Sequence, residues 1–137
     1  MSHSSGTVLL TGFPRQAARV AMKMFMAQKR RVVLLTPKEF ENEARTLLSD
    51  EQGTVVTGNS SSIDLGLSGE EVKAIQTEVE EVHHLEDSYH GSPNTMRKVL
   101  VDGTRSLLEF SLDLPKLRRF VLYSSLFSSG WKKGEVF

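Results

Sequence analysis

The sequence predicts an α/β fold, in which an open parallel sheet of about five strands carries helices on both faces. Two short runs, 8–10 and 32–35, are apolar at every position, as is typical of strands buried on both faces of a parallel sheet. Between them, apolar residues recur at spacings of three and four, which is the pattern of one helix face. Strands and helices then alternate along the chain, and this order favours parallel strands joined by right-handed crossovers.

The first strand–helix–strand unit is the one around which the other elements are organised. We expect a strand over 7–11, a turn over 12–15, a helix over 16–29 and a second strand over 31–36. The expected buried face of the helix consists of Ala17, Ala18, Ala21, Met22, Phe25 and Met26. The turn that opens such a helix is where dinucleotide-binding folds hold a pyrophosphate, although a tight turn with Pro14 near the helix start needs no ligand.

The middle of the chain predicts two further helices and a third strand. After the second strand we expect a charged helix over 38–48, whose buried side consists of Phe40, Ala44, Leu47 and Leu48. The β-branched run 54–57 is expected to be a strand, because a glycine and a serine-rich loop follow it. Ser68 and Glu71 have the spacing of a capping box, which predicts a helix over 69–78.

The last third of the chain completes the alternation. We expect a fourth strand over 79–85, the longest helix over 94–112, ended by a proline, and a fifth strand over 119–123. We find no internal repeat and no linker that would divide the chain. Residues 7–137 are therefore expected to form one domain, incomplete as it stands, after a disordered leader at 1–6.

Composition limits the class of protein. The 137 residues carry 17 basic and 17 acidic side chains, so no net field favours nucleic acid or an anionic membrane as a partner. No apolar run approaches the roughly 20 residues that cross a bilayer, and the N-terminus lacks the features of a signal peptide. The absence of cysteine excludes disulfides and thiol catalysis, and it fits the cytoplasmic location that we expect.

Six segments occur in an order that points to a known family: VLLTGFP (8–14), VTGN (56–59), DLGLS (64–68), VHHL (82–85), VDGTRSLLE (101–109) and FVLYSS (120–125). Together they resemble the N-terminal part of an extended short-chain dehydrogenase/reductase, in particular its epimerase-like and thioester-reductase-like (male-sterility-type) members. The resemblance implies a Rossmann-like fold, an NAD(P) cofactor and kinship with oxidoreductases or epimerases, and it covers only the first part of a full extended reductase.

The sequence departs from the family pattern at positions that bear on chemistry. The glycine-rich turn of the family would place glycines at 12, 15 and 18, whereas the chain has Gly12, Arg15 and Ala18. Arg15 either blocks the approach of the pyrophosphate or offers its guanidinium to the phosphates. The acidic pair 86–87 replaces two alanines of the family and would repel a phosphate, and Leu100 replaces an asparagine that supports the catalytic residues.

The resemblance also implies a cofactor site at the ends of the strands. Its residues would be Thr11, Gly12, Phe13, Pro14, Arg15, Gln16, Lys38, Asn59 and Leu85. After the second strand an acid favours a free ribose 2′-hydroxyl and a base favours a 2′-phosphate, so Lys38 favours NADP(H) if a dinucleotide binds. The alternative is that Lys38 only begins a solvated helix.

Two functions of different classes remain open. Ser125 matches the family hydroxyl that binds a substrate carbonyl, but the expected Tyr-x-x-x-Lys would follow beyond the last residue, so we expect these residues alone not to catalyse the family reaction. The chain is then the cofactor-binding part of an oxidoreductase, or a non-enzymatic Rossmann-like module, a pseudoenzyme that acts through protein contacts or a regulatory ligand. We expect no metal site, because His83 and His84 point to opposite faces of a strand. We also expect a homo-oligomer or a protein partner to cover the incomplete sheet.

Overall fold

The computed structural model describes residues 6–59, 62–85 and 101–122. Five strands form one sheet in the order β3-β2-β1-β4-β5, and all four neighbouring pairs are parallel. The strands are β1 (Thr7–Leu10), β2 (Val32–Thr36), β3 (Gly53–Thr57), β4 (Val79–His84) and β5 (Arg119–Leu122). The open parallel sheet predicted from the apolar runs is therefore confirmed.

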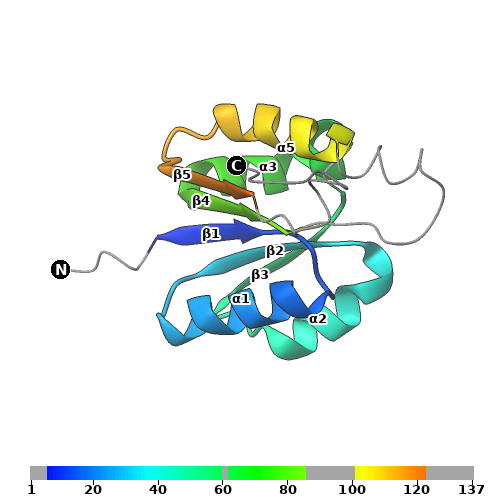
Figure 1. Ribbon diagram of the computed structural model, residues 1–137, viewed down its shortest axis with the longest axis vertical. Coiled ribbons are helices and arrows are strands. Elements are labelled where there is room, and N and C mark those ends of the chain that lie inside the picture. The colour runs from blue at the N-terminus through cyan, green and yellow to red at the C-terminus, as the bar shows by residue number, and fades with distance from the viewer. Residues whose placement is uncertain (1–5, 60–61, 86–100, 123–137) are drawn as a thin grey trace, which may run out of the picture.

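Helices cover both faces of this sheet, as the alternation of elements predicts. Figure 1 shows α1 and α2 on one face and α3 and α5 on the other. The helices are α1 (Gln16–Ala27), η1 (Lys38–Phe40), α2 (Glu41–Leu47), η2 (Ile63–Gly66), α3 (Gly69–Glu78) and α5 (Gly103–Leu112), where η marks a 3-10 helix. No helix within the described ranges is long and apolar enough to cross a membrane.

The sheet separates two hydrophobic clusters, which explains why the strands are apolar at every position. Val8 and Leu10 belong to the cluster beneath α1 and α2, whereas Leu9 belongs to the cluster beneath α3 and α5. Successive side chains of a strand point to opposite faces, so a strand that is covered on both sides needs apolar residues throughout. The three residues are fully buried.

Two predicted helix faces are wrong in part. The stretch 38–48 is divided into the short η1 and α2, and Leu47, predicted to be buried, is 37% exposed. Because α2 begins only at Glu41, the residues that face the sheet are Ala44 and Leu48, which are one turn apart. Ala17 of the predicted α1 face is also exposed, whereas Ala18 beside it is fully buried.

Several predictions fall partly or wholly outside the described residues. These are residues 1–5 of the expected leader, the segment 94–100 of the long helix, the acidic pair 86–87, Leu100 and Ser125. Gly6 is described and buried, and its carbonyl accepts a hydrogen bond from Arg30.

Candidate functional site

The carboxyl ends of the five strands meet at one edge of the sheet, and the candidate site lies there. β1 leads into α1 on one face, whereas α5 follows β4 on the opposite face (Figure 1). In open α/β sheets, ligands bind where the connections of two neighbouring strands diverge in this way. The turn 11–16 after β1, Lys38 after β2, Asn59 after β3 and Leu85 after β4 are the predicted site residues at this edge.

Gly12 begins the turn and has no space for a side chain. Its φ is +100°, a backbone conformation that L-residues rarely adopt. A Cβ atom at this position would lie 3.0 Å from the backbone carbonyl carbon and oxygen and the Cβ of Leu85. The turn is closed by a 2.9 Å hydrogen bond from the Arg15 N–H to the Gly12 carbonyl, and the Phe13–Pro14 peptide bond within it is cis. Glycine is therefore required at position 12 by both conformation and contact.

The turn delivers the chain to the N-terminus of α1. Arg15 is the N-cap in an extended conformation, and its side chain makes no capping hydrogen bond. The first turn of the helix contains no acidic residue. The first amide groups of a helix have no carbonyl partner within it, and they lie at the positive end of the helix dipole. This end of α1 is consequently suited to an anion.

The side chain of Arg19 connects the turn to α2. Its Nε donates a 2.7 Å hydrogen bond to the Pro14 carbonyl, and its guanidinium lies 4.9 Å from the centre of the Phe13 ring. It also forms an ion pair with Glu43 of α2. Sequence reasoning noted Arg19 only as a residue off the apolar face. The available signal was its place in the first helical turn, since helical side chains point back toward the N-terminus.

A second set of contacts joins the start of the turn to β4. The Thr11 N–H donates to the His83 carbonyl (3.1 Å), and the Leu85 N–H donates to Thr11 Oγ1 (3.2 Å). The same Oγ1 lies 2.7 Å from His84 Nδ1, and the other ring nitrogen of His84 lies 3.1 Å from Thr104 Oγ1 in α5. His84 is fully buried, and burial lowers the pKa of its ring to about 4, so the ring is neutral at pH 7.

The two histidines of β4 point to opposite faces, as predicted from their adjacency. His84 faces α5, whereas the ring of His83 contacts Phe25 of α1 edge-on at 4.8 Å. His83 Nε2 lies 2.9 Å from Glu81 Oε1, and Arg30 reaches the same carboxylate at 3.4 Å with one terminal nitrogen and 3.0 Å with the other. Arg30, Glu81 and His83 thus form a buried polar cluster, which sequence reasoning missed although Glu81 and His83 alternate on one strand face.

For both Glu81 and His83, burial shifts the pKa in one direction and the hydrogen bond between the two side chains shifts it in the other. Burial raises the pKa of Glu81, but the hydrogen bonds from His83 and Arg30 and the charge of Arg30 together leave that pKa below its ordinary value. Burial, together with the charges of Arg30 and Arg119, lowers the pKa of His83, and these effects outweigh the Glu81 carboxylate, which raises it. At pH 7 a neutral His83 therefore donates its Nε2–H to an ionised Glu81.

The structure thus brings some predicted site residues into contact and leaves others apart. Thr11 and Gly12 both contact Leu85, and the buried side chains of Thr11, Phe13 and Leu85 support the turn from beneath. Lys38 and Asn59 are exposed after the next two strands along the sheet. The candidate site is therefore the backbone of the turn, and Lys38 and Asn59 follow neighbouring strands at the same edge of the sheet.

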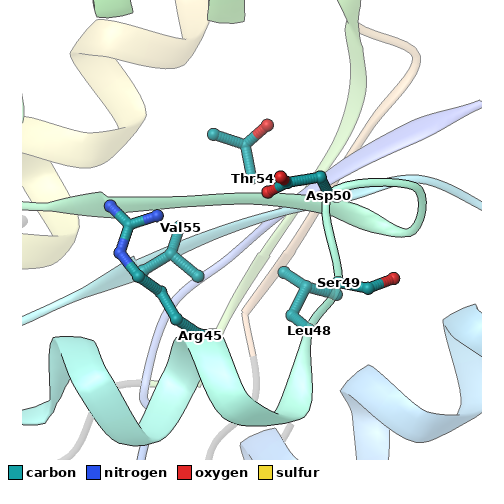
Figure 2. A pocket seen from close by; sticks show the side chains of 7 residues that line it. Arg45, Leu48, Ser49, Asp50, Thr54 and Val55 are labelled. Carbon is teal, nitrogen blue, oxygen red and sulfur yellow. The ribbon is translucent and has the colours of Figure 1, made fainter.

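Two cavities lie away from this edge. Figure 2 shows the larger, of about 400 Å³, between α2 and the start of β3; its lining residues are Arg45, Leu48, Ser49, Asp50, Gly53, Thr54 and Val55. Two of its polar side chains are already used in local pairs, because Arg45 binds Glu41 and Arg31 binds Thr54 Oγ1. The other cavity, of about 260 Å³, lies between η2, α3 and α5.

Comparison with known proteins identifies relatives of the chain. Residues 18–137 match the sequence profile of the family described as "Male sterility protein". The fold is similar to a reductase (R) domain of a nonribosomal peptide synthetase from Mycobacterium tuberculosis, with a TM-score of 0.72 and 21% identity over 91% of this chain and 34% of that one. Against curated protein sequences, the chain has no significant match.

Two further solved structures are similar and contain a nicotinamide dinucleotide. One is a short-chain dehydrogenase/reductase superfamily protein from Agrobacterium tumefaciens with bound NAD (TM-score 0.60, 26% identity, 87% of this chain and 32% of that one). The other is Gre2 from Candida albicans in complex with NADPH (TM-score 0.71, 16% identity, 88% of this chain and 37% of that one). The chain spans about a third of the length of these solved structures.

Proposed function

Because this chain belongs to the male sterility protein family and shares the fold of extended short-chain dehydrogenases/reductases, we propose that it binds a nicotinamide dinucleotide at the turn between β1 and α1. The pyrophosphate lies against the N-terminus of α1, near the backbone of Gly12 and Arg15. The observation that carries the proposal is Gly12, whose positive φ and contact with Leu85 keep the start of α1 close to the switch point of the sheet.

A direct binding measurement tests this proposal. NADPH and NADH are titrated against the protein by calorimetry and by nicotinamide fluorescence. Saturable binding with one site per chain is expected for at least one of the two cofactors. The absence of binding by both at millimolar concentration overturns the proposal.

We propose further that the preferred cofactor is NADP(H). Lys38 is exposed directly after β2, and neither Thr36 nor Pro37 supplies the acid that would bind a free ribose 2′-hydroxyl. Lys38→Ala is expected to weaken NADPH binding about tenfold, which is the effect of losing one charge-assisted contact, and to leave NADH binding unchanged. Lys23→Ala, which removes another exposed lysine, on α1, is the matched control. An equal loss for both cofactors in Lys38→Ala contradicts the preference.

Arg15 takes the place of the second glycine of the family turn, and we propose that its guanidinium binds a phosphate oxygen. The planar guanidinium can donate two parallel hydrogen bonds to a phosphate. Arg15→Gly is therefore expected to weaken binding of both cofactors. Tighter binding by the glycine variant would instead mean that the arginine obstructs the pyrophosphate.

The family relationship also suggests what the bound cofactor does. For the whole protein we propose an oxidoreductase or epimerase reaction, with the Ser125 hydroxyl directed at a substrate carbonyl. The alternative, a pseudoenzyme that binds a dinucleotide or a protein partner without turnover, is favoured by the replacement of two turn glycines by Arg15 and Ala18. Turnover by the whole protein distinguishes the two. A reductase oxidises NADPH as it reduces a carbonyl substrate, and an epimerase interconverts two epimers with no net change in the cofactor, whereas a pseudoenzyme does neither.

A further inference from the structure

His84 connects the candidate dinucleotide turn to the helix on the opposite face of the sheet. One ring nitrogen, Nδ1, lies 2.7 Å from Thr11 Oγ1, directly before Gly12. The other, Nε2, lies 3.1 Å from Thr104 Oγ1 in α5. Thr11 and His84 are 73 positions apart, and both are buried. The two nitrogens of one ring thus contact the turn after β1 and helix α5.

The hydrogen bonds around Thr11 determine which nitrogen of His84 carries the proton. Thr11 Oγ1 already accepts the N–H of Leu85. Among the described residues, the Thr11 hydroxyl has no hydrogen-bond partner other than Leu85 and His84, so its own proton is directed at Nδ1. Nδ1 is then the acceptor, and Nε2–H donates to Thr104. In this arrangement each of three donors has an acceptor: Leu85 N–H, Thr11 O–H and His84 Nε2–H.

The direction of the Thr11 O–H bond matters because it determines how Thr11 holds the turn. With its proton directed at Nδ1, the Thr11 oxygen presents a lone pair to the Leu85 amide. That bond and the close packing of Gly12 on Leu85 are the contacts that keep the start of the turn against β4. A ring protonated at Nδ1 would instead donate to the same oxygen as Leu85, and the Thr11 proton would then have no acceptor among the described residues.

We infer that His84 is a positioning residue for the dinucleotide turn: its unprotonated Nδ1 orients the Thr11 hydroxyl, which in turn fixes Gly12 and the start of α1 against β4. The inference rests on the proposed dinucleotide site, because the turn that His84 positions is the one assigned to the pyrophosphate. The burial of the ring supports it, since a neutral ring is required for one nitrogen to act as acceptor.

The two ring nitrogens can be tested separately by substitution. The side-chain oxygen of asparagine can take the place of Nδ1, whereas the amide of glutamine reaches the position of Nε2. His84→Asn is therefore expected to bind NADPH within about twofold of the unaltered protein, and His84→Gln about five- to tenfold more weakly, as for one lost hydrogen bond. His83→Gln is the matched control: it changes the neighbouring buried histidine, whose side chain faces α1, and is expected to leave binding within about twofold.

A spectroscopic measurement on the unaltered protein accompanies the binding data. Long-range ¹H–¹⁵N correlation spectra of the histidine rings at pH 7, assigned through-bond by correlations from each ring to its own backbone, are expected to show His84 protonated at Nε2 only. A ring that is charged, or protonated at Nδ1, overturns the inference even if the variants do not fold. Equal binding by the asparagine and glutamine variants overturns it as well. A protein that shows the expected tautomer but binds neither NADPH nor NADH refutes the proposed function and, with it, the assignment of His84 to a cofactor turn.

Discussion

At Gly12, a single residue combines an unusual backbone conformation with a close contact to Leu85, the residue that follows β4. Its φ of +100° excludes most side chains, and the Leu85 backbone lies where a Cβ atom would be. Gly69 differs in both respects, because it is the first residue of α3 and nothing lies within 4 Å of an added Cβ. The two glycines therefore form a matched pair for substitution.

Gly12→Ala is expected to lower the free energy of unfolding by about 2 kcal/mol, since alanine must adopt a strained φ and displace Leu85. The same change should weaken dinucleotide binding. Gly69→Ala is expected to leave stability unchanged or to raise it, because alanine has the higher helix propensity. Urea unfolding curves of both variants check the prediction, and equal effects at the two positions would contradict it.

The buried pair of Arg30 and Glu81 is the other residue-scale feature with a large expected effect. Both side chains are more than nine-tenths buried, whereas the pair of Arg45 and Glu41 lies on the surface of α2. A buried ion that loses its partner keeps the full cost of desolvation, but an exposed ion is solvated by water. The effect of losing one partner on the free energy of unfolding therefore depends on how deeply the ion pair is buried.

Arg30→Met is accordingly expected to destabilise the protein by about 3 kcal/mol. Arg45→Met, the exposed control, is expected to change the free energy of unfolding by less than about 0.5 kcal/mol. In the double variant Arg30→Met/Glu81→Met, part of the stability should return, since no unpaired charge remains buried, but the Nε2–H of His83 loses its acceptor. A double variant no more stable than Arg30→Met would mean that the lost packing of Arg30 dominates.

At the scale of elements, α3 is the helix whose beginning is most clearly encoded by its own sequence. Glu71 N–H donates to Ser68 Oγ (3.2 Å), and the Ser68 N–H donates to the Glu71 carboxylate (3.0 Å). This is the capping box predicted from the spacing of the two residues. α1, by contrast, begins without a side-chain cap. The difference is consistent with a structural role for the start of α3 and a ligand-binding role for the start of α1.

Removal of the cap should therefore affect stability and not binding. Ser68→Ala is expected to lower the free energy of unfolding by about 1 kcal/mol, the usual effect of losing an N-cap side chain. NADPH affinity should remain unchanged, since α3 lies on the other face of the sheet from α1 (Figure 1). Thermal unfolding and calorimetric titration of the same sample measure both quantities. A reduced affinity without a change in stability would contradict this division of roles.

At the scale of the whole molecule, three buried groups on β4 make the fold sensitive to acid. The pKa values of Glu81, His83 and His84 are all lower in the folded protein than in free side chains. Below each ordinary pKa the unfolded chain binds more protons than the folded one, so stability decreases as the pH falls. The two histidines lower the stability as the pH falls below 6.5, and Glu81 lowers it further below pH 4.5.

The contribution of His84 can be stated with a magnitude. Its pKa falls from 6.5 to about 4, so its neutral form contributes about 3 kcal/mol above pH 6.5, and this is lost progressively between pH 6.5 and pH 4. Urea unfolding at pH 7.5, 5.5 and 4.5 is expected to show this decrease. In His84→Gln the curve should be flatter over the same interval, whereas an unchanged slope would show that other groups dominate.

Association of the chain stays a prediction. Within the described ranges, Leu108 and Leu112 are exposed apolar residues of α5, with 44% and 76% of their surfaces accessible. Such residues on one helix favour contact with another protein surface. Light scattering at high concentration tests it, and a monomer under those conditions would contradict the expected oligomer.

Much of the fold was predictable because its signals are local. The doubly buried strands are visible as apolar runs, α3 is visible through Ser68 and Glu71, and Gly12 indicates the turn after β1. The candidate site was predicted at that turn for the same reason. The error at Leu47 arose because the predicted helix over 38–48 is divided into η1 and α2, which shifts the residues that face the sheet. Ala17 lies at the margin of the buried face of α1, which consists of Ala18, Ala21, Met22 and Phe25.

The sequence by itself thus determined the order of elements, the faces of the strands and the glycine turn, since each depends on residues within a few positions of one another. Only the tertiary structure decided the partners of the polar groups. Thr11 meets His84 across 73 positions, and Arg30 meets Glu81 across 51. The physical reason is that hydrophobic periodicity reports which side of an element is buried, whereas a hydrogen bond or ion pair needs two specific atoms within about 3 Å. That proximity exists only after parallel β1 and β4 have been brought side by side.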